Sequence, residues 1–342
     1  MSPLPVGKLS PQLLQKFFQS LQLRDPRVHV GPKLGEDAAV IDIGDRYLVV
    51  STDPVTYATD EIAWYALVVN ANDLAVRGTR PRWFLATLLL PEGKSDEESA
   101  GALLSQLAEA CEELDVSLVG GHTEVTSGLD HPIIIGTMLG EVEKAKLVTT
   151  SGAQVGDAVI LTKGVPLEGA AIIAREREAE LLRRGVSPAT IRTAKNFLRT
   201  PGISVIPEAE IAGEIAEVHA MHDPTEGGIA TALFELAEAA GVGLRIDRER
   251  IMILPEAKEL CDAFGLDPLG TIASGALLVT LAPAAAGIVI HALAREGIDC
   301  HYIGQVVPAE RGVTLVEVPR ERPMPVFPQD EISKLFARPH DA

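Results

Sequence analysis

The segment Met221-His-Asp-Pro-Thr-Glu-Gly-Gly228 decides most about the fold of this 342-residue chain. A strand is expected to end before Asp223, and Thr225 then serves as the N-cap of the following helix. Gly227 and Gly228 would stand in the first helical turn, where each glycine costs roughly 1 kcal/mol relative to alanine. Because stability does not favour them there, we expect them to let a ligand approach the helix amino end, where N–H groups attract phosphate.

Acidic residues recur at turns and strand ends in the first half of the chain. Gly35, Glu36 and Asp37 form a tight acidic turn before a predicted strand, and an ordinary hairpin turn is the alternative interpretation. Thr52 and Asp53 end the next predicted strand. Strand ends are where α/β folds present ligands, although Asp is also a common turn former.

A third acidic position lies inside a helix predicted over about residues 60–77. Asn70, Asn72 and Asp73 interrupt an otherwise apolar stretch, although Asn and Asp are poor mid-helix residues. A buried carboxylate must be paired or must hold a metal. The alternative is a helix break with a new N-cap at this point.

A glycine-containing loop is predicted to follow a short strand at residues 117–119. Gly120 and Gly121 would expose backbone N–H groups that can cradle phosphate, with Thr123 beside them. His122 and Glu124 are the candidate acid–base residues, and an ordinary hydrogen-bonded loop histidine is the alternative.

Composition restricts the class of partner. The net charge of -18 argues against nucleic acid and against an anionic membrane surface. An acidic protein binds a polyphosphate only with a cation between the two, which favours Mg²⁺. Three widely spaced cysteines give no disulfide framework and no CxxC metal site. The sequence has no membrane-length apolar run and no signal-peptide pattern, so we expect a cytoplasmic protein.

The order of predicted elements indicates an α/β (α+β) chain of two layered domains. Residues 1–148 are expected to form the first domain, with the order β-β-α-β-α-β-β, and residues 149–322 the second. Residues 323–342 are expected to be a loosely packed tail. The sequence has neither a GxGxxG nor a GxxxxGK[ST] motif, so any nucleotide is held in another way.

These motifs, in this order, resemble the aminoimidazole ribonucleotide (AIR) synthetase superfamily. Its members include the hydrogenase maturation factor HypE, selenophosphate synthetase and thiamine monophosphate kinase. The nearest branch looks like HypE, because residues 223–233 are similar to its Asp-Pro-Thr-Arg-Gly-Gly-Leu-Ala-Thr-Ala-Leu pattern, with Glu226 in place of Arg. The resemblance covers residues 30 to 320.

The resemblance implies an amino-terminal domain that pairs with a second subunit to form a β-barrel, and a carboxy-terminal α/β sandwich. It also implies ATP bound in a cleft of a homodimer. Carried over by position, the Mg²⁺ ligands would be Asp37, Asp53, Asp73 and Asp223. Gly120 and Gly121 would approach the phosphates.

Three departures from the family affect the expected reaction. HypE ends in a cysteine that carries the modified group, whereas this sequence ends Arg338-Pro-His-Asp-Ala342. Selenophosphate synthetase needs a reactive residue near its amino terminus, but the first cysteine here is Cys111. Thiamine monophosphate kinase has an acid where this chain has His122. The acceptor is therefore expected to be different or lost.

Two functions are the main hypotheses, and an α/β metabolic enzyme of another superfamily, without Mg²⁺ dependence, is the third. One is an ATP- and Mg²⁺-dependent enzyme that phosphorylates or activates a small-molecule or carbamoyl-type acceptor. The other is a non-catalytic nucleotide-binding scaffold or accessory factor in metalloenzyme maturation. The four aspartates favour the first, and the missing cysteine and Glu226 favour the second.

Overall fold

The structure is a computed structural model that describes residues 7–336 of the chain. Its contacts divide these residues into two units. The amino-terminal unit contains residues 24–31 and 37–147. The carboxy-terminal unit contains the described parts of residues 1–23 and 148–342, together with residues 32–36. The helix α1 (Pro11–Ser20) therefore groups with the second half of the chain.

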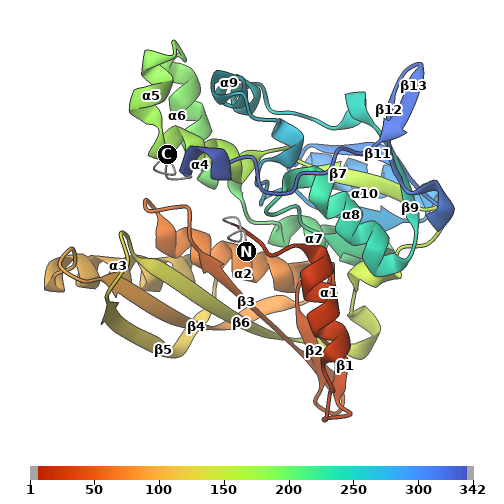
Figure 1. Cartoon of the computed structure of the whole chain (residues 1–342). Helices are drawn as coiled ribbons and strands as arrows, with labels where there is room; N and C mark the ends of the chain where they lie inside the picture. The colour runs from red at the N-terminus through yellow and green to blue at the C-terminus, as the bar shows by residue number, and fades with distance from the viewer. Residues whose placement is uncertain (1–6, 337–342) are drawn as a thin grey trace. The chain divides into compact units, whose positions relative to one another are not determined.

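The amino-terminal unit is a six-stranded sheet with the order β1-β2-β3-β6-β4-β5. Only the pair β4 and β5 is parallel, and the other neighbours are antiparallel. Helices α2 and α3 lie along one face of this sheet (Figure 1). The strands are β1 (Val28–Val30), β2 (Ala39–Asp42), β3 (Arg46–Val55), β4 (Arg80–Pro91), β5 (Ser117–Thr126) and β6 (Ile133–Glu143), and the helices are α2 (Ile62–Ala75) and α3 (Glu97–Glu113).

Helix α2 is the core helix of this unit. Every residue from Ile62 to Ala75 except Val69 is buried, as expected for a helix that is apolar on all sides. The helix runs unbroken through Asn70, Asn72 and Asp73. A helix break with a new N-cap at these residues was the alternative, and the continuous helix excludes it.

The loop predicted at residues 120–124 is not present, because β5 continues as a strand to Thr126. Parallel pairing with β4 provides the backbone hydrogen-bond partners along this stretch, with a register irregularity beside Leu85. Gly121 has φ +146°, and a Cβ there would lie 1.9 Å from the carbonyl oxygen of Ala86. Close approach of the two strands, and not a phosphate turn, therefore explains this glycine.

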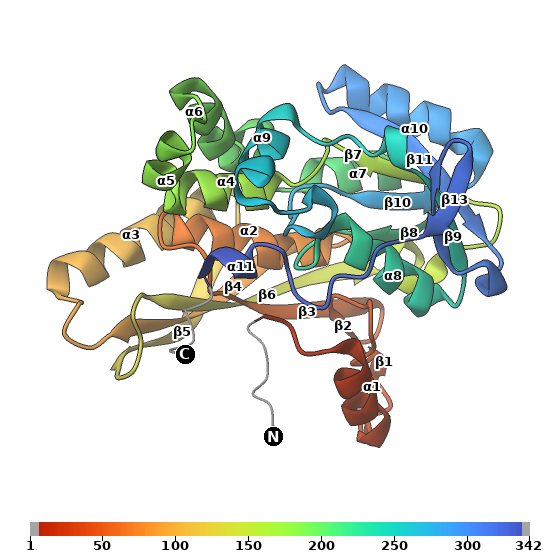
Figure 2. The same cartoon turned by 45° about the horizontal axis from the view of Figure 1, so that its top comes forward.

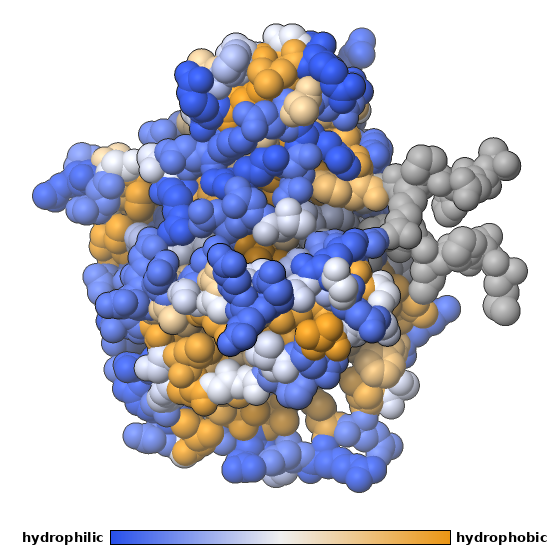
Figure 3. Space-filling model, turned by 90° about the vertical axis from the view of Figure 1, so that its left-hand side faces the viewer, coloured by the Kyte–Doolittle hydropathy of each residue, from blue (hydrophilic) through white to orange (hydrophobic). Residues whose placement is uncertain are grey.

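Strand β5 is an edge strand whose side chains are largely exposed. Leu118, Val119 and Val125 are 43%, 55% and 62% exposed. The face of the molecule on the side of β5 and α3 carries apolar patches between hydrophilic ones (Figure 3). An exposed edge with apolar side chains is a surface that proteins usually cover.

The carboxy-terminal unit contains a seven-stranded sheet with the order β13-β12-β9-β11-β7-β10-β8. Helix α8 packs on one face, and α7 and α10 lie on the other (Figure 2). All residues of β7 and β10 are buried, which suits central strands covered on both faces. The strands are β7 (Ala158–Thr162), β8 (Val218–His222), β9 (Gly243–Asp247), β10 (Leu278–Leu281), β11 (Cys300–Val307), β12 (Val313–Glu317) and β13 (Arg320–Pro323). The helices are α4 (Leu167–Glu176), α5 (Glu178–Arg183), α6 (Pro188–Asn196), α7 (Ile206–Ile215), α8 (Gly228–Ala240), α9 (Pro255–Phe264), α10 (Pro283–Arg295) and α11 (Ser333–Phe336).

The expected loosely packed tail is wrong for its described part. Strand β13 is followed by Met324 at 2% exposure and Ile332 at 0% exposure, so this segment is docked. Residues 337–342, which complete the predicted tail, lie outside the described residues.

Two further sequence expectations concern membranes and cysteines. Within residues 7–336, none of the helices combines the length and apolar character that a bilayer crossing requires. Cys111, Cys261 and Cys300 are buried free thiols.

Candidate functional site

Asp37 and Asp73 meet at the side chain of Ser51 within the amino-terminal unit. The Ser51 hydroxyl donates a short hydrogen bond to Oδ2 of Asp73 and lies 3.2 Å from the carbonyl oxygen of Asp37. Asp73 is 4% exposed, so α2 presents a nearly buried carboxylate to strand β3. A buried carboxylate is costly unless it is paired or holds a cation.

Arg77 is the charged partner of Asp37. Its Nη2 lies 3.1 Å from Oδ2 of Asp37, and the Arg77 side chain is completely buried. Arg77 was not predicted to be a site residue, although an arginine at the end of an apolar helix must find a hydrogen-bond acceptor. This pair fixes the Asp37 carboxylate beside the end of α2.

Asp53 lies two residues beyond Ser51 on β3 and therefore faces the same side of the sheet. Asn70 fixes the backbone there, because Asp53 N–H donates to Asn70 Oδ1 at 2.9 Å and Asn70 Nδ2 donates to the Asp53 carbonyl at 3.2 Å. The Asp53 carboxylate is half-buried, and no described residue forms a hydrogen bond or ion pair with it. Thr52 points away, and its hydroxyl donates to the carbonyl of Gly136 at 2.7 Å.

The three aspartates thus lie around the junction of β3 and α2. Carboxylate oxygens are the ligands that Mg²⁺ prefers, and Mg²⁺ commonly uses only one or two of them together with water and phosphate oxygens. The carboxylate chemistry of these residues suits a magnesium ion, and Asp53 is the carboxylate that no described residue engages. Asn70 has a structural role that the sequence did not reveal.

In the carboxy-terminal unit, Asp223 directly follows the last residue of β8. It is 1% exposed. His222 is equally buried, and its Nε2 lies 3.0 Å from Oε2 of Glu235 on α8. Asp223 therefore stands at the end of a strand, as predicted, beside a histidine–carboxylate pair that sequence reasoning did not identify.

The amino end of α8 differs from the prediction in one respect. The N-cap is Gly227, with φ 82°, and not Thr225, because the chain needs a left-handed residue before Gly228 begins the helix. The N–H of Gly227 donates to Oδ2 of Asp330 at 2.6 Å, and that of Gly228 donates to the Thr225 carbonyl at 3.0 Å. The N–H groups of these two glycines, at the helix end where free N–H groups were expected, are therefore used within the chain.

Gly35 and Glu36 also have structural partners in the carboxy-terminal unit. A Cβ at Gly35 would lie 2.5 Å from the carbonyl oxygen of Glu235, so close packing against α8 requires glycine there. The Glu36 carboxylate accepts the N–H groups of Thr150 and Ser151 at 3.3 and 3.2 Å. These contacts account for both residues without a ligand.

His122 and Glu124 lie on the exposed surface of β5. Their side chains are 65% and 51% exposed, and His122 Nε2 lies 3.2 Å from Oε2 of Glu124. The hydrogen bond from Thr126, followed by that from His122, holds the pKa of Glu124 below its usual value. A carboxylate with a lowered pKa is a weaker base, so nothing local activates this pair.

Two buried acids of the carboxy-terminal unit were not predicted. Burial, assisted by the nearby charges of Glu226 and Asp330, raises the pKa of Glu168 to about 7. Burial also raises the pKa of Asp330 to about 6, against the lowering effect of the Gly227 and Ile332 N–H groups. Neither residue belongs to a recognisable motif, and only the folded chain brings them together.

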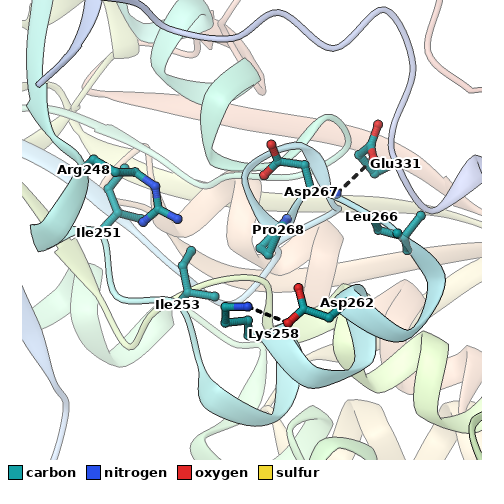
Figure 4. A pocket seen from close by; sticks show the side chains of 10 residues that line it. Arg248, Ile251, Ile253, Lys258, Asp262, Leu266, Asp267, Pro268 and Glu331 are labelled. Carbon is teal, nitrogen blue, oxygen red and sulfur yellow. Dashed lines mark hydrogen bonds and ion pairs between the residues drawn. The ribbon is translucent and has the colours of Figure 1, made fainter. Parts of the chain in front are cut away.

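A separate cavity of about 630 Å³ lies in the carboxy-terminal unit (Figure 4). Its wall combines apolar side chains with the ion pair of Lys258 and Asp262, whose charged atoms are 2.5 Å apart. Glu331 reaches its edge and accepts the N–H of Asp267 at 3.0 Å. No residue predicted from the sequence as a site residue lines this cavity.

Comparison with known proteins agrees with this fold. The amino-terminal domain of the AIR synthase related proteins matches residues 35–142, and their carboxy-terminal domain matches residues 154–317. A putative hydrogenase expression/formation protein of Methanocaldococcus jannaschii is 30% identical over 278 residues, which cover 78% of each chain.

Two HypE proteins are among the proteins to which this chain is similar. Carbamoyl dehydratase HypE of Cupriavidus necator is 27% identical over 88% of this chain and 84% of its own length. A crystal structure of the hydrogenase maturation protein HypE in complex with ATP has a TM-score of 0.70 at 23% identity, covering 93% of this chain and 96% of that one. The expected two-domain α/β fold is confirmed, and the chain belongs to the family of AIR synthase related proteins.

Proposed function

We propose that this protein binds Mg²⁺–ATP and transfers the terminal phosphoryl group to an acceptor of small-molecule or carbamoyl type. The observation that carries the proposal is the meeting of Asp37 and Asp73 at Ser51, whose hydroxyl contacts the Asp73 carboxylate and the Asp37 carbonyl, with Asp53 two residues further along β3. Burying the Asp73 carboxylate costs free energy, and a bound cation would offset that cost.

The charge of the whole chain supports the same conclusion. At -18, the protein repels a nucleotide triphosphate unless a divalent cation lies between the phosphates and the carboxylates. Asp223 of the carboxy-terminal unit stays a predicted further ligand. The relative HypE, which has been crystallised with ATP, supports the choice of nucleotide.

The residues of this chain would contribute mainly position and charge. In phosphoryl transfer, catalysis depends on alignment and on neutralising charge at the moving group. Bound Mg²⁺ supplies that neutralisation. Arg77 and Ser51 hold Asp37 and Asp73 in place, and Asn70 fixes the backbone that carries Asp53.

The alternative is a nucleotide-binding accessory factor without turnover. The buried cysteines favour a change of acceptor, because burial raises the pKa of Cys261 and Cys300 to about 12, which leaves almost no thiolate. Turnover of ATP with a panel of carbamoyl and other small acceptors separates the two functions. Tight Mg²⁺–ATP binding without turnover of any acceptor in the panel would favour the accessory factor.

We also propose that the protein is a homodimer in which β5 is covered by a second copy. The three exposed apolar side chains of this edge strand, Leu118, Val119 and Val125, support that arrangement. Val119→Lys should convert the dimer to a monomer in light scattering. Leu104→Lys, at 44% exposure on α3, is the matched control and should leave the dimer intact.

The test of the site compares two Asp→Asn variants by calorimetry with Mg²⁺–ATP. Asp73→Asn keeps an oxygen for the Ser51 hydroxyl but removes the charge, so affinity should fall by about tenfold or more. Asp45→Asn, in the turn between β2 and β3, removes the same charge elsewhere and should bind like the wild type. Equal affinity of the two variants would remove Asp73 from the site.

A further inference from the structure

The cavity of about 630 Å³ in the carboxy-terminal unit is built from three parts of the chain (Figure 4). The short helical turn η4 (Arg248–Arg250) and the residues after it form one part, α9 with the turn η5 (Pro268–Gly270) forms another, and Glu331 is the third. Ile251, Ile253 and Leu266 supply most of the apolar wall. Small-molecule ligands occupy cavities of this volume.

Most charged groups of the wall are engaged within the fold. Glu331 Oε2 accepts the Asp267 N–H at 3.0 Å, and Glu331 Oε1 lies 2.5 Å from Lys334 Nζ. Lys258 and Asp262 neutralise each other at 2.5 Å, and each side chain is 60% exposed. These pairs account for one acid at the edge of the cavity and for one acid and one base at its rim.

Arg248 carries the charge of this wall that the described residues do not pair. Its side chain is half-buried, and within residues 7–336 nothing forms a hydrogen bond or ion pair with it. Its charge also acts on Glu317, but that carboxylate is already bound to Arg322 at 2.9 Å. The other described arginines that are buried or half-buried all have an acceptor, and they are Arg46, Arg77, Arg175 and Arg177. A guanidinium group that is partly removed from water and left without an acceptor suits an anionic ligand.

Asp267 limits how much negative charge such a ligand can carry. Its Oδ1 accepts the Leu269 N–H at 2.9 Å, whereas none of the described residues bonds to its Oδ2. In Figure 4, Arg248 lies on one side of the cavity, and Asp267 with Glu331 lies on the other. Because the wall holds more carboxylates than cationic groups, it would repel a polyphosphate, while a single negative charge can be taken up by Arg248.

We propose that this cavity binds a small monocarboxylate with an apolar body. The two carboxylate oxygens match the parallel N–H groups of the Arg248 guanidinium. The apolar body contacts Ile251, Ile253 and Leu266, and its removal from water adds to the affinity. Asp267 and Glu331 disfavour a second negative charge on the ligand. The ligand of this cavity therefore differs in charge from the nucleotide proposed above.

The test uses the full chain without Mg²⁺ and without nucleotide, so its result is independent of the proposed ATP binding. The probe is 4-phenylbutanoate, and 4-phenylbutanamide is the uncharged probe with the same apolar body. In saturation-transfer NMR, the carboxylate should bind with a dissociation constant of about 1 mM or lower, and the amide about tenfold or more weakly. No binding of the carboxylate at about 10 mM, or equal binding of the two probes, would overturn the proposal.

An arginine variant identifies the group that binds the carboxylate. Arg248→Gln removes the charge but keeps a polar side chain, so it should weaken 4-phenylbutanoate binding by about tenfold and leave 4-phenylbutanamide binding unchanged. Arg250→Gln is the matched control, because Arg250 lies in the same turn, pairs with Asp247 at 3.1 Å and does not line the cavity. It should bind both probes like the wild type. An equal loss in the two variants, or no loss in Arg248→Gln, would overturn the proposal.

A second variant tests the restriction to one negative charge. Asp267→Asn keeps an oxygen for the Leu269 N–H and removes one carboxylate charge. It should increase the affinity for phenylsuccinate, which has two carboxylates, by about threefold or more relative to the wild type. Unchanged affinity for phenylsuccinate, or wild-type binding of phenylsuccinate as strong as that of 4-phenylbutanoate, would overturn the restriction to a monocarboxylate.

Discussion

Gly121 provides a sharp test of whether β5 is a strand or a phosphate-binding loop. A Cβ at this position would lie 1.9 Å from the Ala86 carbonyl oxygen and 2.8 Å from its nitrogen. Strands β4 and β5 would have to separate by roughly 1 Å to accept it. Overpacking and the positive φ of +146° together should cost Gly121→Ala about 2–6 kcal/mol of unfolding free energy.

The neighbouring glycine is a matched control. A Cβ at Gly120 would meet only the Leu85 side chain, at an ordinary 3.8 Å, and its φ is not in the left-handed region. Gly120→Ala should therefore change stability by about 1 kcal/mol or less. In a phosphate-binding loop the two glycines would have the same role, so the two variants would then behave alike.

The assay is thermal unfolding followed by tryptophan fluorescence. Trp64 and Trp83, the two tryptophans of the chain, lie in the amino-terminal unit, so the signal reports on that unit. Gly121→Ala should lower the unfolding midpoint by about 8 °C or more, and Gly120→Ala by only a few degrees at most. Equal midpoints would refute the strand-packing explanation, and loss of ATP affinity in stable Gly120→Ala would restore the phosphate loop.

Two other predictions concern buried groups. Lys163 and Glu208 form a buried ion pair at 2.6 Å, with 5% and 1% of the side chains exposed, so Glu208→Ala should cost about 3–5 kcal/mol by stranding the ammonium group. The double variant Lys163→Met/Glu208→Leu should recover most of that loss in thermal unfolding, and a double variant no more stable than Glu208→Ala would contradict the pairing. Burial raises the pKa of Cys111 to about 11 and that of the other two thiols to about 12, so a thiol reagent at pH 8 should react slowly with the native protein and fast after denaturation. Rapid reaction of a native thiol would show that one of them is accessible.

Sequence patterns predicted most of the fold because they reflect local periodicity. The helix predicted after Thr225 is α8, and the helix predicted over about residues 60–77 is α2. The incorrect predictions concern residues whose conformation depends on pairing with segments that are distant in the sequence. Strand β5 was shortened at Gly120, because glycines normally indicate turns and only the neighbouring strand β4 explains them here.

The candidate site also contains some residues that the local sequence pattern indicates and others that only the folded structure identifies. Asp73 was recognisable because a carboxylate inside an apolar helix needs a reason, and its burial agrees with that argument. Arg77, Asn70 and Ser51 were not assigned, because their roles depend on contacts between α2, β3 and the segment before β2. Asp330 was assigned to a loose tail, since nothing in the local pattern indicates that it caps a helix about 100 residues away.

The most direct test of the central claim is ATP binding measured by calorimetry with and without Mg²⁺. The carboxylates Asp37, Asp53, Asp73 and Asp223 cannot hold a polyphosphate themselves, so ATP should bind with Mg²⁺ and should not bind with a chelator present. Asp223→Asn should weaken binding in the presence of Mg²⁺. ATP binding of equal strength with and without the metal would show that these aspartates do not bind the nucleotide through Mg²⁺.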